Sequence, residues 1–307
     1  MVKNSKILVA GGSGFIGSNL INELIANGNK VISLSKTRNI KNSNQQNVSY
    51  IVHDMTKPIN INLFDNISDI DYIVNCSGYV DHRDFLNGGL RIFNDHFESL
   101  YSLTCLAIDL KVKALIHIGS SDEYGEAKSP IKESIRESPI SPYALGKLSS
   151  THYLQQCFKK GILKTVIIRP FLVFGEGQKK DRFLPYLIDN CLKDKEFKVS
   201  KGEQIRDYLY IKDFNRALMK SFDNKKAYGE VINIASGIPI SIKDVITKVQ
   251  VIIGKGKPIF GALNYRKGES MNLYADIDKA KKILNWEPRY ELDNSLKKVI
   301  NWYLNNG

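Results

Sequence analysis

The feature that most constrains this chain is a glycine-rich run placed between its first apolar segment and its first helical pattern. Residues 7–10 predict a short buried strand, the run GGSGFIG follows at 11–17, and a helical pattern covers 15–27. Glycines at this spacing allow a tight turn and let a helix pack closely on a strand. The run therefore predicts the first strand and helix of a parallel sheet, with the helix N-terminus open to a ligand.

The same alternation of short apolar runs and helical patterns continues through the first half of the chain. Strands are predicted at 7–10, 30–34, 49–52, 72–75, 114–118 and 165–169, and helices near 15–27, 90–110 and 143–160. Helices of this length can form the right-handed crossovers that join parallel strands. We expect an α/β fold with a doubly wound parallel sheet of the Rossmann type over residues 1–170.

The pattern changes after Arg169-Pro170, where helices begin to dominate. A helix near 182–194, a strand at 208–211 and a strand at 231–234 are predicted. Asp213 is expected to cap the helix that follows the first of these strands, and Ser241 a helix that ends near 253, with two more helices after it. We expect a smaller C-terminal α/β substrate lobe over 171–307, with 207–236 woven back into the first domain.

Composition excludes several classes of protein. The 307 residues are 43% hydrophobic, and the formal net charge of +12 is spread along the chain rather than gathered into basic runs. This distribution argues against nucleic acid and favours an acidic small ligand. Without a signal peptide or a long apolar segment, a cytoplasmic protein with no membrane partner is expected. The four cysteines are too far apart to predict a metal site or a disulfide framework: Cys76, Cys105, Cys157 and Cys191.

The glycine-rich run predicts a dinucleotide site. Gly11 allows the tight turn, Gly14 lets the backbone approach a pyrophosphate, and Gly17 lets helix and strand pack closely. Phe15 and Ile16 lie in the first helical turn, whose free N–H groups favour the phosphates. The alternative interpretation is a plain strand-to-helix turn in which the glycines serve geometry alone.

The end of the second predicted strand bears on the choice of dinucleotide. NAD sites usually have a carboxylate there for the ribose 2′-OH, whereas this chain has Ser35, Lys36 and Arg38. A hydroxyl flanked by two cations suits the 2′-phosphate of NADP, with NAD as the alternative. The same residues could also be an exposed basic turn. Asp54, followed by Met55, is expected to meet the adenine.

The motif Tyr-x-x-x-Lys occurs three times, beginning at Tyr124, Tyr143 and Tyr208. A glycine follows Tyr124 directly and Tyr208 lies in a short strand pattern, so neither begins a helix. Ser141 and Pro142 precede Tyr143 as a helix cap and a first helical residue. The motif at Tyr143 is therefore the one that we interpret as functional.

Tyr143 and Lys147 lie one turn apart on the same face of the predicted helix. A tyrosine has a reference pKa near 10, and an acid or base that works near neutrality needs a value roughly three units lower. Lys147 and a positive nicotinamide ring can stabilise the phenolate. Ser120, at the end of the fifth predicted strand, can hydrogen-bond the reacting oxygen, although turn chemistry would also explain a serine there.

With these residues in place, the chain resembles the extended short-chain dehydrogenases/reductases that modify nucleotide sugars, the epimerase/dehydratase group. The resemblance covers essentially the whole chain. It includes the run at 11–17, Ser120 four residues before Tyr124-Gly125, Tyr143/Lys147, Arg169-Pro170, Gly175, Arg206-Asp207-Tyr208 before Asp213, Arg266-Lys267-Gly268-Glu269 and Leu284-Asn285-Trp286-Glu287-Pro288.

The resemblance implies roles for residues in both halves of the chain. It makes Ser120, Tyr143 and Lys147 the catalytic set and adds Pro170 to the cofactor site. The residues implied for the nucleotide-diphosphate sugar are Ser121, Asp122, Arg182, Arg206, Tyr208 and Arg266. Guanidinium groups suit phosphate oxygens, and surface charge is the alternative for each arginine.

Departures from the family pattern bear on the reaction. Similar sugar 4,6-dehydratases have a Glu where this chain has Asp122, and some have an Asp in place of Ser121. Leu172 stands where many relatives have Asn. The helix near 90–110 also lacks the usual Asn, with Glu98 nearest in register. The shorter Asp122 argues against dehydration.

These patterns predict an NADPH-dependent reduction of a 4-keto deoxysugar linked to a nucleotide, in polysaccharide biosynthesis. The alternatives are a 4-epimerase or 4,6-dehydratase with tightly bound NAD and, of another class, a non-catalytic Rossmann protein that senses NADP or binds RNA. A homodimer through the helices near 90–110 and 143–160 is also expected. Its basis is a set of leucines too broad for one buried stripe: Leu100, Leu103, Leu106 and Leu110.

Overall fold

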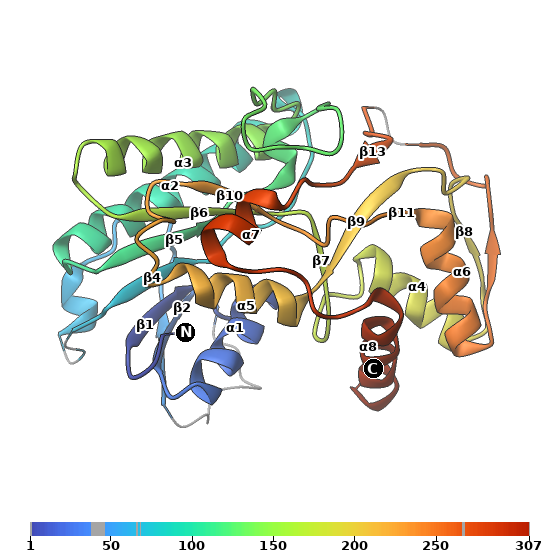
Figure 1. Ribbon diagram of the computed structural model, residues 1–307, viewed down its shortest axis with the longest axis horizontal. Coiled ribbons are helices and arrows are strands. Elements are labelled where there is room, and N and C mark those ends of the chain that lie inside the picture. The colour runs from blue at the N-terminus through green and yellow to red at the C-terminus, as the bar shows by residue number, and fades with distance from the viewer. Residues whose placement is uncertain (1, 38–46, 66, 68, 266–267, 307) are drawn as a thin grey trace.

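A computed structural model describes residues 2–37, 47–65, 67, 69–265 and 268–306. Its main element is a seven-stranded sheet in the order β10-β6-β5-β4-β1-β2-β3, with every pairing parallel (Figure 1). The strands are β1 Lys6–Ala10, β2 Lys30–Ser35, β3 Val48–Val52, β4 Tyr72–Asn75, β5 Ala114–Ile118, β6 Thr165–Pro170 and β10 Val231–Ile234. The predicted doubly wound α/β fold is confirmed.

Helices cover both faces of this sheet, because its strands are apolar on both sides. One face, with Ile7 and Val9, packs on α1 (Phe15–Ala26) and α5 (Ile211–Ser221). The other face, with Leu8 and Ile32, packs on α2 (Gly89–Asp109) and α3 (Pro142–Lys159). Figure 1 shows these two layers above and below the strands.

The leucines of α2 do not form a surface for a partner. Leu100, Leu103 and Leu106 are fully buried in the core, so the basis given for a dimer from the sequence is wrong. The outward face of α2 and α3 carries aromatic residues instead. The ring centroids of Phe97 and Tyr153 are 5.7 Å apart, and the side chain of Tyr101 is 51% exposed. These rings give the dimer prediction a different physical basis.

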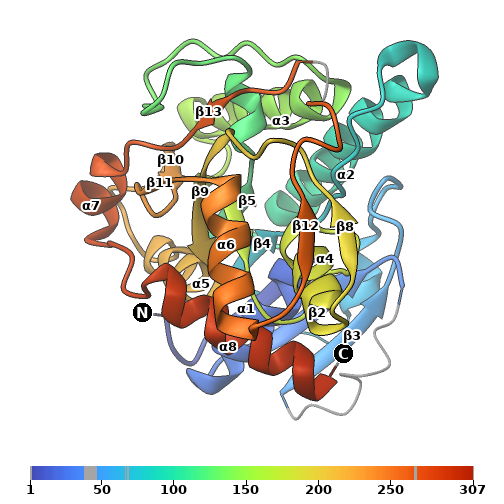
Figure 2. The same ribbon diagram turned by 90° about the vertical axis from the view of Figure 1, so that its right-hand side faces the viewer.

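Among the described residues, the C-terminal part contains four helices and two small sheets, which lie toward the right of Figure 1 and face the viewer in Figure 2. No helix in the described ranges is long and apolar enough to span a bilayer. In the larger sheet, β9 Ile205–Tyr210 pairs with β7 Leu172–Phe174, β11 Pro239–Ser241 and β13 Asn272–Leu273; in the smaller, β8 Glu196–Lys198 pairs with β12 Lys257–Ile259. The helices are α4 Phe183–Leu192, α6 Ile242–Ile253, α7 Asp278–Leu284 and α8 Leu292–Asn306.

The chain returns from this lobe to the large sheet through α5 and β10, the latter beside β6. We therefore propose a substrate lobe that begins after residue 170 and is interrupted by this return. Ser241 caps α6 as predicted, accepting a hydrogen bond from the Asp244 N–H. The capping role predicted for Asp213 is wrong, because α5 begins two residues earlier. The buried Asp213 carboxylate instead accepts hydrogen bonds from the backbone of Arg289 and Tyr290.

Candidate active site

The site lies where the strand order reverses, between β1 and β4. Ligands of open parallel sheets bind at this position, outside the carboxyl ends of the strands. The segments after β1, β4 and β5 meet there, since the Cys76 N–H donates to Ala10 and a Cβ built on Gly11 would lie 2.7 Å from the Cys76 carbonyl oxygen. The topology thus brings the glycine-rich run and the Ser120 segment to one edge of the sheet.

The glycine-rich run forms a cradle that side chains would fill. Gly11 has φ +77°, and a Cβ on Gly17 would lie 2.3 Å from the Gly11 carbonyl oxygen. Gly14, the N-cap of α1, has no side chain to satisfy the first N–H groups of the helix. The sequence and geometry therefore fit the pyrophosphate of a dinucleotide.

The other residues that the sequence predicts for the cofactor differ in how deeply they are buried. Phe15 and Ile16 begin α1 and are half-buried. Met55, after β3, is 8% exposed and belongs to the core. Pro170 is the last residue of β6 and is half-buried.

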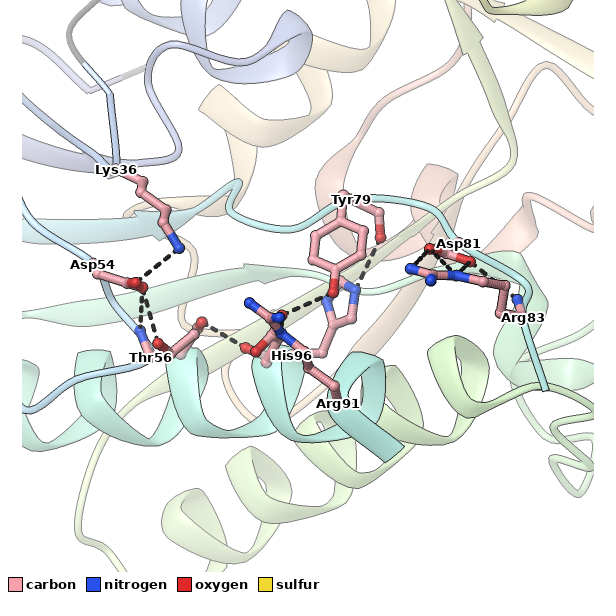
Figure 3. A network of polar contacts seen from close by, with 10 residues as sticks. Lys36, Asp54, Thr56, Tyr79, Asp81, Arg83, Arg91 and His96 are labelled. Carbon is pink, nitrogen blue, oxygen red and sulfur yellow. Dashed lines mark hydrogen bonds and ion pairs between the residues drawn. The ribbon is translucent and has the colours of Figure 1, made fainter. Parts of the chain in front are cut away.

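The end of β2 carries a hydroxyl and a cation, as the sequence predicts. The Ser35 hydroxyl accepts a hydrogen bond from the Ser13 N–H at 3.0 Å, which ties β2 to the glycine-rich run. Lys36 Nζ lies 2.8 Å from Asp54 Oδ2 (Figure 3), and this hydrogen bond lowers the pKa of Asp54 to about 2. The two charges therefore offset each other where the adenosine end is expected. Arg38 lies outside the described residues.

Tyr143 and Lys147 lie in the first turns of α3, as the sequence predicts. The Ser141 hydroxyl caps the helix by accepting from the Ala144 N–H at 3.1 Å. Both functional side chains are buried, at 6% and 5% exposed. The Lys147 ammonium donates to the Ile118 carbonyl at 2.9 Å, so it crosses from α3 to the end of β5. Its burial lowers its pKa to about 8.

The expected lowering of the Tyr143 pKa is not found in the protein alone. Burial raises the pKa of Tyr143, the nearby Asp122 carboxylate raises it further, and the Ser120 hydroxyl only partly counteracts both. The chain by itself therefore holds a neutral phenol at this position, next to the Ser120 hydroxyl.

His96 of α2 belongs to the site and was missed from the sequence. Its Nε2 is 2.9 Å from the Tyr79 carbonyl oxygen (Figure 3), and its ring packs edge-on against Tyr143 with centroids 5.0 Å apart. Burial, followed by the charge of Lys147, lowers its pKa to about 3, so the imidazole is neutral. Glu98, expected as the nearest counterpart of the family Asn, is exposed. Helical spacing from the buried Leu100 would have identified position 96 as inward-facing.

A second imidazole, that of His82, lies against Tyr143. The His82 ring is 5.8 Å from the Tyr143 ring, and its Nε2 is 3.9 Å from Asp122 Oδ2. Burial raises the pKa of Asp122, while His82 and Arg206 counteract it. Ser121 is almost fully buried. Of the two residues predicted there for substrate, Asp122 is thus the one whose charge acts on Tyr143.

The predicted diphosphate-binding arginines differ in their surroundings. Arg206 Nη2 lies 3.0 Å from Glu269 Oε1, and its guanidinium acts on the charge of Asp122. Arg182 is exposed at the N-terminus of α4, close enough to Tyr143 to lower its pKa slightly. Arg266 lies outside the described residues.

Tyr208, implied for the base or ribose, lies on β9 within the core. It is 7% exposed, and its hydroxyl has no hydrogen-bond partner among the residues that the structure describes. Within those residues, no group of His, Cys, Asp and Glu side chains could hold a metal ion.

A known protein family and individual known proteins are similar to this chain over most of its length. Residues 7–235 match the family described as "NAD dependent epimerase/dehydratase family". A putative UDP-glucose 4-epimerase of Methanocaldococcus jannaschii is 27% identical over 98% of this chain and 99% of its own.

Two solved structures superpose over the whole fold. The UDP-N-acetylglucosamine 4-epimerase of Methanobrevibacter ruminantium M1, in complex with UDP-N-acetylmuramic acid, gives a TM-score of 0.90 at 26% identity, covering 100% of both chains. The UDP-glucuronic acid 4-epimerase of Bacillus cereus, in complex with UDP-glucuronic acid and NAD, gives 0.87 at 28% identity, covering 98% of this chain and 99% of its own.

Proposed function

Because the chain belongs to the NAD dependent epimerase/dehydratase family of extended short-chain dehydrogenases/reductases, we propose that it oxidises and reduces C4 of a sugar carried on UDP, with epimerisation as the net reaction. The observation that carries this proposal is the convergence of Ser120, Tyr143 and Lys147 beside the glycine cradle. These residues come from the end of β5 and from α3. The relatives described above support a UDP-sugar and inversion at C4.

Each side chain of the set has a distinct task in this proposal. A nicotinamide dinucleotide held at the cradle supplies a hydride acceptor and donor. The Ser120 hydroxyl hydrogen-bonds the C4 oxygen, and the Tyr143 phenol takes or returns its proton. Lys147 holds its ammonium through the Ile118 carbonyl and favours the phenolate electrostatically. Arg206 is suited to the diphosphate, exchanging Glu269 for phosphate oxygens.

A second candidate is the NADPH-dependent reduction of a 4-keto deoxysugar, which the sequence favours. One observation supports it: Ser35 and Lys36 stand where an NAD site usually has a carboxylate. Against it, the Lys36 charge is matched by Asp54 in the free protein, and the compared epimerases favour the alternative. Dehydration has less support, since Asp122 is shorter than the Glu that similar dehydratases use.

Product analysis separates these reactions. Protein purified without added cofactor is denatured and its dinucleotide identified, then fresh protein is incubated with UDP-glucose, UDP-glucuronic acid or UDP-N-acetylglucosamine. A C4 epimer formed without added cofactor supports epimerisation. Consumption of NADPH with a nucleotide-linked 4-keto sugar, and no epimer, supports the reductase. Failure of both reactions in protein that binds the dinucleotide would favour a non-catalytic sensor.

A further inference from the structure

Glu123 is a buried carboxylate with no place in the reaction proposed above. It lies in the short 3-10 helix Ser121–Tyr124 that follows Ser120, and its side chain is fully buried. Its Oε1 accepts a hydrogen bond from the Ser120 N–H at 2.7 Å. Its Oε2 accepts from the Thr151 hydroxyl and from Arg169 Nε, both at 2.8 Å. One side chain therefore joins the Ser120 turn, helix α3 and strand β6.

The attachment to α3 is made on the face that carries the catalytic pair. Thr151 is one helical turn beyond Lys147 and two turns beyond Tyr143, so the three residues share one face of α3. The Ser120 hydroxyl in turn accepts from the Asp122 N–H at 3.1 Å, which completes a capping box with Glu123. The distance between the Ser120 turn and the Tyr143 face thus depends on the Glu123 carboxylate.

Stability alone is a poor reason for this arrangement. Arg169 is also fully buried, and its Nη2 pairs with Glu123 at 2.6 Å and with Glu137 at 2.9 Å. Removing charges from water costs several kcal/mol per ion, roughly as much as their attraction returns, so apolar residues of similar volume would often serve as well. Both oxygens of the buried Glu123 carboxylate are hydrogen-bonded, and a buried carboxylate held in this way fixes one geometry.

We propose that Glu123 is a positioning residue that holds the Ser120 hydroxyl and the Tyr143 phenol toward one substrate oxygen. The proposal rests on the function proposed above. Glu123 does not touch the sugar in this scheme. It acts through the Ser120 backbone and the Thr151 hydroxyl, with Arg169 fixing the orientation of the carboxylate.

Glu123 also acts on Lys147 through its charge. Four titratable groups face the ammonium: the carboxylate of Glu123, the thiol of Cys76 and the imidazoles of His96 and His117. Burial raises the pKa of Cys76 to about 12 and lowers the pKa of both histidines far below neutrality, so these three groups are uncharged. The carboxylate is the charged member, and it raises the pKa of Lys147 against the effect of burial.

Glu123→Gln tests the proposal, because glutamine has nearly the same shape as glutamate but no charge. It presents either an N–H donor or a neutral oxygen to Arg169, where the parent presents a carboxylate oxygen. We expect kcat to fall about 10- to 100-fold, the range for a catalytic group misplaced by up to an ångström, with KM and dinucleotide affinity within about twofold. The loss of activity at high pH should begin at a lower pH, because Lys147 loses its supporting charge. If Glu123 had only a structural role, Glu123→Gln would lower the unfolding temperature but would not change the pH at which activity begins to fall.

Glu137→Gln is the matched control, since it also removes a carboxylate from Arg169 but does not contact Ser120 or Thr151. Hydrogen exchange of the peptide over 119–125 provides a readout that needs no substrate. Faster exchange in Glu123→Gln than in Glu137→Gln is expected, because the single amide oxygen of Gln cannot accept from both the Ser120 N–H and Arg169. Thr151→Val keeps every charge. It should lower kcat without changing the pH at which activity begins to fall at high pH.

The outcomes separate this proposal from the function on which it rests. Equal exchange at 119–125 in both Gln variants, or a kcat and pH profile of Glu123→Gln that match those of Glu137→Gln, would overturn the positioning role. A parent protein that converts no nucleotide sugar would overturn the proposed function, and the exchange measurement would still decide the role of Glu123. If Glu123→Gln fails to fold, unchanged kcat in Thr151→Val refutes the link to α3.

Discussion

Lys147→Met is expected to make the protein more stable and inactive. The ammonium is 5% exposed, and burial lowers its pKa from the ordinary 10.5 to about 8. Each pKa unit corresponds to about 1.4 kcal/mol, so keeping this charge in the folded state costs about 3 kcal/mol below pH 8. Met has a similar shape and no charge, but it leaves the Ile118 carbonyl without its donor, a loss of about 1–2 kcal/mol.

The stability that Lys147→Met gains over the parent depends on pH. The lowered pKa of Lys147 sets the direction of that dependence. Between about pH 8 and 10.5 the folded parent has released the Lys147 proton while the unfolded chain still holds it. The unfolded state then binds more protons, so parent stability rises with pH in this window. The variant has no such rise. Its advantage of about 1–2 kcal/mol at pH 7 should therefore shrink and reverse by pH 10.5.

Urea unfolding followed by circular dichroism from pH 7 to 10.5 measures this difference. Subtracting the variant from the parent at each pH removes the titration of all other groups. Lys160→Met, at an exposed position just after the same helix, is the matched control. A flat difference for Lys147→Met would refute the reasoning, because the lysine would then titrate alike in the folded and unfolded chains.

Three further predictions concern chemistry, cofactor and assembly. Tyr143→Phe should slow single-turnover hydride transfer about 10²- to 10⁴-fold with unchanged dinucleotide affinity, and a parental rate would move the proton transfer elsewhere. Replacing Lys36 and Arg38 with Ala should weaken NADP binding by about 1.5–3 kcal/mol per lost charged hydrogen bond and leave NAD nearly unaffected; titration showing equal losses would contradict NADP selectivity. Light scattering should give a dimer that Phe97→Glu dissociates, since the half-buried Phe97 lies in an aromatic cluster with Tyr153 and the exposed Tyr101; a monomeric parent would refute the interface.

The large sheet could be predicted from the sequence because its determinants are local. Short apolar runs, the glycine-rich turn and the Ser141-Pro142 helix start each act within a few residues, and the observed strands match the predicted ones to within one or two residues in the first domain. The capping role predicted for Asp213 by the same local reasoning was wrong for a physical reason. A carboxylate near a helix start can satisfy distant backbone groups instead, here those of Arg289 and Tyr290.

The interior of the site was less predictable because its contacts join residues far apart in sequence. His96 reaches Tyr143 only once α2 packs beside α3, and no local pattern specifies that its imidazole is neutral. Glu123 did leave a local pattern, Ser-x-x-Glu from Ser120, which is typical of a capping box. Its links to Arg169 and Thr151 required the assembled sheet.

The two ends of the candidate site bear on different properties of this enzyme. The Tyr143 end bears on proton transfer, and the adenosine end bears on the choice of dinucleotide. At the Tyr143 end, Lys147 lies among neutral histidines and a neutral thiol and faces the Glu123 carboxylate, an arrangement that suits proton transfer in either direction. That end does not distinguish epimerisation from net reduction, because both need the same acid and base. At the adenosine end, Lys36 is held by Asp54 and a 2′-phosphate must compete with a carboxylate already in contact at 2.8 Å. The choice between NAD and NADP therefore depends on the free energy of exchanging that ion pair for a phosphate, at the adenosine end rather than at the reacting carbon.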